Sequence, residues 1–234
     1  MLKVLRPGLA QLLTPVGKAL ARTPLTPNML TVIGAVGVTA GALTLFPTGH
    51  LFIGTVVCTV FVLTDMLDGA LARITGSSGV FGAFLDSTLD RVADSAVFGG
   101  IAIWLAGGGH DRPLALVALF CLVTGGLVSY AKARAEGLGL RCDVGIAERS
   151  ERLLIGLVAI GLAGLGVPYV LPAGLWILAV LSAITFGQRV YAVRKAATPR
   201  QPGAPVGTGA AGVPGDSGAA EAPGSAGASG SAAT

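Results

Sequence analysis

The sequence contains few charged residues and few of the side chains that bind zinc or form disulfides. Only 12% of its 234 residues are Asp, Glu, Lys or Arg, whereas soluble domains contain about 25%. The chain has only two histidines, and its three cysteines stand far apart without a CxxC pair. Neither a zinc site nor a disulfide framework is therefore expected. Aromatic residues make up 6% and the net charge is +4. Without a basic cluster interleaved with aromatics, nucleic acid is not an expected partner.

Apolar residues, in contrast, fill 53% of the chain and gather in six long runs. Most of these runs approach the roughly 20 residues that an α-helix needs to cross a bilayer, and the fifth is short. They cover approximately residues 28–46, 51–74, 80–106, 113–135, 152–167 and 173–193. The sequence therefore predicts an all-α integral membrane protein with six transmembrane helices within residues 23–197.

The two ends of the chain differ from this helical domain. Residues 1–22 align leucines and a valine along one helical side, with basic residues around them and prolines at two positions. This pattern predicts a juxtamembrane amphipathic helix, bent or broken at the prolines, and lacks the features of a removable signal peptide. Residues 198–234 are mostly Gly, Ala, Pro and Ser, so we expect a disordered tail.

Basic residues indicate the orientation in the membrane. With the N-terminus inside, the cytoplasmic ends of the predicted helices carry 15 of the 16 Lys and Arg residues, and only Arg112 lies on the other side. Because basic loop residues stay in the cytoplasm, we expect both termini to be cytoplasmic in a multi-pass plasma membrane protein.

Four aspartates interrupt the second and third apolar runs, at the cytoplasmic side: Asp65, Asp68, Asp86 and Asp90. One charge at bilayer depth costs roughly 2.5–3.5 kcal/mol on insertion scales, so four of them need a compensating partner. Each pair has helical spacing that places both members on one face, and the turn at 74–79 would bring the two helices side by side. Oxygen ligands suit Mg²⁺, Mn²⁺ or Ca²⁺, and two such ions sharing these carboxylates can clamp a diphosphate.

Other residues near this cluster have predicted roles. Arg73 is suited to a phosphate oxygen, and Gly69 and Ala72 leave room for a base or ribose, although they can equally serve packing alone. Asp94 lies one turn beyond Asp90, and its i, i+3 spacing with Arg91 predicts a structural ion pair.

The pattern D-x2-D-G-x2-A-R-x8-G-x3-D-x3-D, from Asp65 to Asp90, resembles the signature of the CDP-alcohol phosphotransferase family at every fixed position. The resemblance implies a nucleotide-activated lipid or alcohol whose diphosphate binds two Mg²⁺ ions (Mn²⁺ being possible), an attacking hydroxyl and CMP as the leaving group. Asp65, Asp68 and Asp86 match the family's metal ligands. Asp90 matches the residue that serves as metal ligand and general base, the catalytic role.

Residues 25–31, Leu-Thr-Pro-Asn-Met-Leu-Thr, resemble the start of the family's first helix. There Asn28 and Thr31 would contact the nucleotide, while the alternative is a helix start with Thr26 as cap and Pro27 at the first position. The two interpretations are compatible. The residues expected to bind CDP-diacylglycerol are thus Asn28, Thr31, Asp68, Gly69, Ala72 and Arg73.

Basic residues gather again at the cytoplasmic ends of the fourth to sixth runs, at Lys132, Arg134, Arg141, Arg149, Arg152 and Arg189. Positive-inside topology accounts for such a cluster, but Arg152 and Arg189 stand at or within apolar runs, which favours a buried anion such as a phosphorylated acceptor.

Residues 132–136 and 148–153, together with 39–47, resemble the actinobacterial phosphatidylinositol phosphate synthases within this family, a similarity that spans about residues 8–195. The resemblance implies transfer from CDP-diacylglycerol to L-myo-inositol 1-phosphate in a homodimer, formed through the third and fourth transmembrane helices. It assigns Lys132, Arg152 and Arg189 to the acceptor phosphate, with Arg134 and Arg149 as weaker candidates.

The residues alone leave three alternative functions open. Glycerol 3-phosphate also carries a phosphate, so the basic cluster does not distinguish it from inositol phosphate. Intramembrane carboxylates also line cation transport paths, although Arg73 would repel a cation and the far side offers only Asp111. A structural scaffold would leave the aspartates unexplained.

Overall fold

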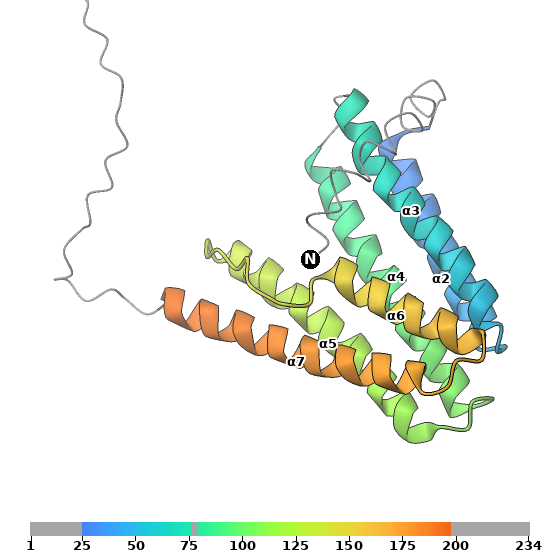
Figure 1. Ribbon diagram of the computed structural model, residues 1–234. Helices are drawn as coiled ribbons and strands as arrows, with labels where there is room; N and C mark the ends of the chain where they lie inside the picture. Colours follow the sequence, from blue (N-terminus) through green and yellow to red (C-terminus); the bar gives the residue numbers. More distant parts are fainter. Residues whose placement is uncertain (1–24, 76–78, 198–234) are drawn as a thin grey trace, which may run out of the picture. The chain divides into compact units, whose positions relative to one another are not determined.

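The computed structural model describes residues 25–75 and 79–197, with side chains for 25–64, 71 and 79–197. The predicted N-terminal helix of residues 1–22 and the predicted tail of residues 198–234 lie outside these ranges. Within them the chain forms α-helices joined by short connections (Figure 1). The helices are α2 Pro27–Leu45, α3 Leu51–Thr75, α4 Val80–Ala106, α5 Arg112–Gly137, α6 Arg149–Gly164 and α7 Val170–Ala197.

The all-α membrane architecture is confirmed. Helices α2, α5 and α7 have the length and apolar composition of membrane-crossing segments, and residues Leu51–Thr64 of α3 form a shorter apolar helix. Helices α4 and α6 do not meet this standard, because α4 carries four charged residues between positions 86 and 94 and α6 has only 16 residues. The number of six membrane spans therefore stays a prediction.

The largest differences from the predicted helix limits are at α6 and α7. Helix α6 begins at Arg149, three residues earlier than expected, because a capping box extends it: the backbone N–H of Glu148 donates to Glu151 Oε2 at 3.1 Å. Such reciprocal caps satisfy backbone donors that a helix start leaves open. Helix α7 runs three residues further at its start and four further at its end than the apolar run 173–193.

The helices pack as a closed series of neighbours. Helix α2 packs against α3 and α4, α4 against α5, α5 against α7, α7 against α6, and α6 back against α3. Helix α4 is central to the shared apolar core, to which it contributes the side chains of Ala93, Ala96, Val97, Phe98, Ile101, Ala102 and Leu105. The part of α4 from Ala93 onward is thereby held in place, Asp86 and Asp90 precede it, and Asp94 lies at its start.

Large apolar side chains also cover the outside of the bundle. Leu116, Phe81 and Trp176 are 68%, 66% and 58% exposed. In water such a surface would promote aggregation, whereas in a bilayer it faces lipid chains of matching polarity. The exposed apolar side chains agree with the membrane setting that the composition predicts.

Helices α2 and α4 come into close contact at a glycine. A Cβ atom added to Gly100 would lie 2.5 Å from the carbonyl oxygen of Ala42, which is backbone and has little freedom to move. Glycine is therefore required here for the two helices to keep their spacing.

Gly100→Ala is expected to lower the thermal unfolding midpoint of the protein purified in detergent. The added methyl group would push α2 and α4 apart, and overpacking of this kind costs about 1–3 kcal/mol. Gly99→Ala is the matched control, because its methyl group would meet only Leu122 Cδ1 at an ordinary 3.7 Å. Equal midpoints for the two variants would contradict the close approach.

Candidate active site

The predicted carboxylate cluster falls on α3 and on the first half of α4. Asp86 and Asp90 lie one turn apart on α4 and are both half-buried. Asp65 and Asp68 belong to the helical backbone of α3, but their side chains lie outside those described, as do Gly69, Ala72 and Arg73. Among the described side chains no three His, Cys, Asp or Glu groups gather closely enough to bind a metal. The described pair supplies hard oxygen ligands suited to a divalent cation, and the full four-carboxylate site stays a prediction.

The start of α2 lies against the same part of α4. Thr26 caps α2 by accepting a hydrogen bond from Met29 N at 3.3 Å, and Pro27 occupies its first turn, which confirms the predicted helix start. A Cβ atom on Gly82 would lie 3.0 Å from Asn28 Oδ1. The glycine of the sequence signature therefore leaves the room that the Asn28 side chain occupies.

Thr31 lies one turn further along α2 and is buried, with 4% of its surface exposed. Its hydroxyl donates to the carbonyl oxygen of Pro27 at 3.1 Å. Contact of Asn28 or Thr31 with a nucleotide remains a prediction.

A chain of four charged side chains joins α4 to α6. Arg149 NH1 lies 2.7 Å from Asp90 Oδ1, and Arg149 Nε donates to Asp94 Oδ1 at 3.2 Å. Asp94 Oδ2 accepts from Arg152 NH2 at 3.3 Å. Asp94 and Arg152 are 7% and 2% exposed. The aspartate proposed as general base is thereby linked, through alternating charges, to the basic residues at the start of α6.

The predicted pairing of Arg91 with Asp94 is wrong. Arg91 NH2 instead lies 3.5 Å from Asp90 Oδ2, while both carboxylate oxygens of Asp94 accept from the arginines of α6. The i, i+3 spacing permits the predicted pair, but the two α6 arginines reach the buried carboxylate from the neighbouring helix and take its acceptor positions.

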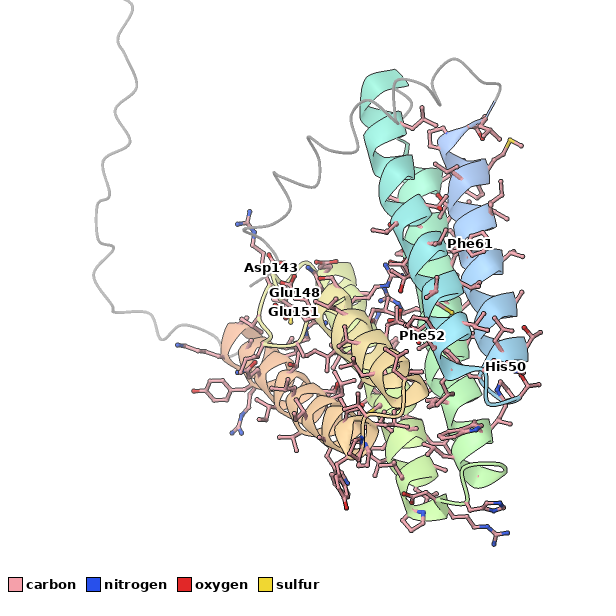
Figure 2. The ribbon with its side chains drawn as sticks, turned by 45° about the vertical axis from the view of Figure 1, so that its right-hand side comes forward. His50, Phe52, Phe61, Asp143, Glu148 and Glu151 are labelled. Atoms are coloured by element: carbon pink, nitrogen blue, oxygen red, sulfur yellow. The ribbon has the colours of Figure 1, made fainter. Side chains whose placement is uncertain are left out.

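Lys132 and Arg134 lie in the last two turns of α5. Lys132 Nζ is 2.8 Å from Asp143 Oδ1 and 3.7 Å from Glu136 Oε1, whereas Arg134 is exposed to solvent. Asp143 belongs to the loop between α5 and α6, residues 138–148, which we call the α5–α6 loop. Figure 2 shows Asp143 near Glu148 and Glu151, where this loop leads into α6, and away from His50 at the start of α3.

Arg189 holds the α5–α6 loop against α7. Its Nε donates to the carbonyl oxygen of Val144 at 3.0 Å, and its NH1 donates to the carbonyl oxygen of Val128 on α5. One turn earlier on α7, Thr185 Oγ1 accepts from Ala147 N at 3.1 Å. Arg189 is 7% exposed. Its hydrogen bonds to Val144 and Val128 fix the loop between α5 and α7.

Gly145 lies where the loop packs closely against α7. Its φ of +144° is in the region that favours glycine, and a Cβ atom there would lie 2.6 Å from Thr185 Cγ2. The path of the loop thus depends on a glycine that the sequence pattern did not single out.

Sequence reasoning missed one residue of the site and assigned another to the wrong partner. Asp143 pairs with Lys132 across eleven residues and a helix end, for which no local spacing rule exists. Asp94 was recognised as an ionic residue but assigned to the wrong partner. The Glu136 pairing, in contrast, follows from its i, i+4 spacing with Lys132.

Comparisons with known proteins fit this arrangement. Residues 24–186 match the family model of the CDP-alcohol phosphatidyltransferases. The chain belongs to this family. It is 50% identical over 200 residues to the phosphatidylinositol phosphate synthase of Streptomyces avermitilis, covering 82% of both chains. It is 49% identical over 191 residues to that of Mycobacterium tuberculosis, covering 80% of this chain and 88% of the relative.

Solved structures of the Mycobacterium tuberculosis phosphatidylinositol phosphate synthase share this CDP-alcohol phosphatidyltransferase fold. The crystal structure with CDP-DAG bound matches with a TM-score of 0.77 at 47% identity, covering 82% of this chain and 98% of that one. The crystal structure in complex with manganese and citrate has the same TM-score and identity, with 81% and 93% covered. Family membership confirms the predicted enzyme class, in place of the transporter and scaffold alternatives.

Thr185→Val is expected to loosen the α5–α6 loop. The substitution keeps the side-chain shape but removes the acceptor for Ala147 N, and a buried donor left without a partner costs about 1–3 kcal/mol. Hydrogen exchange measured by mass spectrometry should show faster exchange in residues 138–148. Thr59→Val is the control, because the exposed Thr59 hydroxyl bonds only within its own helix, to Thr55 O at 2.7 Å. Unchanged exchange in Thr185→Val would contradict the role of this bond.

Proposed function

We propose that this protein transfers the phosphatidyl group from CDP-diacylglycerol to L-myo-inositol 1-phosphate, giving phosphatidylinositol phosphate and CMP. One observation carries the proposal: Arg149 lies 2.7 Å from Asp90, the predicted base, and begins a row of basic side chains suited to a phosphorylated acceptor. Relatives at 49–50% identity that are named phosphatidylinositol phosphate synthases support the choice of acceptor.

Asp65, Asp68, Asp86 and Asp90 would hold two divalent cations, Mg²⁺ in our proposal. When bound, they would neutralise the diphosphate of the donor and the charge on the departing CMP. The donor's nucleotide and diphosphate lie against the signature residues and the start of α2. The residues proposed to contact CDP-diacylglycerol are Asn28, Thr31, Asp68, Gly69, Ala72 and Arg73. The manganese complex of the Mycobacterium tuberculosis relative supports the use of a divalent metal.

Asp90 serves as the base in the transfer step. A hydroxyl oxygen of the acceptor attacks the phosphorus that carries diacylglycerol, and the bond from this phosphorus to the oxygen that links it to CMP breaks. The electrons of that bond leave with CMP, and the hydroxyl proton passes to Asp90. Arg149 and Arg91 lie on either oxygen of Asp90 at 2.7 and 3.5 Å, which orients the carboxylate.

The acceptor phosphate binds beside Asp90 among the basic residues of α5, α6 and α7. We propose that Lys132, Arg152 and Arg189 bind it, with Arg134 and Arg149 as further contacts. Arg152 is buried behind Arg149, and Lys132 pairs with Asp143, an exposed carboxylate. A phosphate dianion competes well for Lys132, because a salt bridge exposed to solvent is worth at most about 1 kcal/mol.

This end of the bundle faces the cytoplasm of a plasma membrane in our proposal. The basic residues of the site lie at the ends of α5 and α7 and at the start of α6, whereas Arg112 marks the opposite end of α5, which agrees with the positive-inside rule. We propose a homodimer through α4 and α5. The exposed Leu116, Phe120 and Val123 of α5 offer an apolar face for it.

Asp90→Asn is expected to reduce CMP release by at least about a hundredfold, the scale of a lost general base. Binding of CDP-diacylglycerol should persist, because Asp65 and Asp68 remain. Ser87→Ala on the same helix is the control, since its exposed hydroxyl bonds only to Phe84 O at 3.0 Å. Near-normal turnover in Asp90→Asn would exclude the assigned role.

The acceptor is tested by supplying purified protein in detergent with CDP-diacylglycerol, Mg²⁺ and one of three compounds: inositol 1-phosphate, glycerol 3-phosphate or free inositol. CMP release is expected only with inositol 1-phosphate and should stop when a chelator removes the metal. Release only with glycerol 3-phosphate would keep the mechanism and overturn the acceptor. No release with any of them, from folded protein, would overturn the proposed function.

A further inference from the structure

Asp94 is a buried carboxylate inside the helical bundle. It lies one turn beyond Asp90 on α4, is 7% exposed, and falls outside the family signature. Each of its carboxylate oxygens accepts a hydrogen bond from a different arginine of α6, Oδ1 from Arg149 and Oδ2 from Arg152. A buried carboxylate is costly unless it is paired in this way.

The two arginines depend on Asp94 in turn. Arg152 is 2% exposed, and its other contact is the carbonyl oxygen of Gly125 at 3.5 Å. Arg149 is held between Asp94 and Asp90. A free arginine side chain loses rotamer freedom when it binds a ligand, and this loss weakens binding. Because Asp94 already restricts the guanidinium groups of Arg149 and Arg152, less freedom is lost when a ligand binds them.

The space beside Asp94 and Arg152 is too small for the acceptor. A cavity of about 20 Å³ lies between α4, α5 and α6, lined by Arg91, Ser95 and Arg152 among others. It has room for a single water molecule, which would give a partner to Arg152 Nε, a buried donor with none among the described residues. An inositol phosphate is far too large for this cavity, and the acceptor site that we propose lies instead on the side of Asp90 and Arg149.

We propose that Asp94 is a positioning residue for the acceptor. It fixes Arg149 and Arg152 of α6 in the orientation that binds the acceptor phosphate beside Asp90, without touching the reacting atoms. This inference rests on the proposed function, since it assigns the two arginines to the acceptor. It predicts that Asp94 affects acceptor binding and leaves donor binding unchanged.

The test measures CMP release while the concentration of each substrate is varied separately. Asp94→Asn is expected to raise the KM for inositol 1-phosphate by about tenfold or more, the effect of a lost hydrogen bond between charged groups. The KM for CDP-diacylglycerol should stay within about twofold, the scatter expected for sites that do not couple. Asp94→Glu, which keeps the charge, should restore part of the acceptor affinity. Asp111→Asn is the control, because Asp111 caps α5 at the opposite end, accepting from Leu114 N at 3.0 Å.

A double-mutant cycle distinguishes positioning from an independent effect. If Asp94 acts through Arg152, Asp94→Asn combined with Arg152→Gln raises the acceptor KM by clearly less than the product of the two single effects. Multiplicative effects, or equal rises in both KM values, would overturn the proposal. A second comparison applies if Asp94→Asn alone does not fold. The double variant, which has no unpaired buried charge, is then compared with Arg152→Gln alone. A further rise in acceptor KM is then expected through Arg149, and an unchanged KM would overturn the proposal.

The wild-type protein in the same assay separates this proposal from the proposed function. A wild type that uses only glycerol 3-phosphate would refute the proposed acceptor, and the Asp94 variants would then be measured with that compound. A wild type active with inositol 1-phosphate, combined with an Asp94→Asn variant of normal acceptor KM, would refute the role of Asp94 alone.

Discussion

The charged chain Asp90–Arg149–Asp94–Arg152 is the interaction on which the site depends. Asp94 and Arg152 of this chain are buried. A buried charge is costly when it is unpaired, and the loss of one partner leaves the other charge without compensation. Each charge in the chain has a neighbour of opposite sign, and these ion pairs hold α6 against α4 beside Asp90, the predicted base. Helix α4, which carries two of the aspartates proposed to bind metal, therefore positions α6, which carries two of the arginines proposed to bind the acceptor.

Contacts with the other helices hold α4 and α6 in place around these four side chains. Helix α4 is anchored by its apolar second half and by the glycine contact with α2, and α2 in turn brings Asn28 against Gly82 of the signature. On the other side, Arg189 and Thr185 of α7 hold the α5–α6 loop that leads into α6. In the proposed site, donor residues of α2 and acceptor residues of α6 thus meet α4 from different helices, at Gly82 and at Asp90 about two turns further along, which suits a reaction between a lipid and a water-soluble phosphate.

Features that depend on local sequence could be predicted. Helix positions follow from the lengths of apolar runs, and the start of α2 follows from a Thr-Pro cap whose geometry is set by adjacent residues. The aspartate signature is also local, since its spacing alone indicates paired carboxylates on helix faces.

Features that depend on distant residues could not be predicted. Arg152 and Asp94 are separated by 58 residues, and Arg189 and Val144 by 45, so no periodicity connects them. The error at Arg91 has the same origin: a permitted local pair was displaced by arginines from another helix. The start of α6 was missed because its first turn is charged, although the Glu148 and Glu151 spacing is a recognisable capping signal.

The most direct test of the account is a crystal structure of this protein with Mn²⁺, inositol 1-phosphate and a donor analogue that cannot react. Anomalous scattering would locate the metal, and the difference density would locate the acceptor. We predict Mn²⁺ among Asp65, Asp68, Asp86 and Asp90, with the acceptor phosphate on the basic side chains of α5, α6 and α7 and a hydroxyl facing Asp90. A metal bound elsewhere, or an acceptor phosphate away from Arg149 and Arg152, would contradict the account.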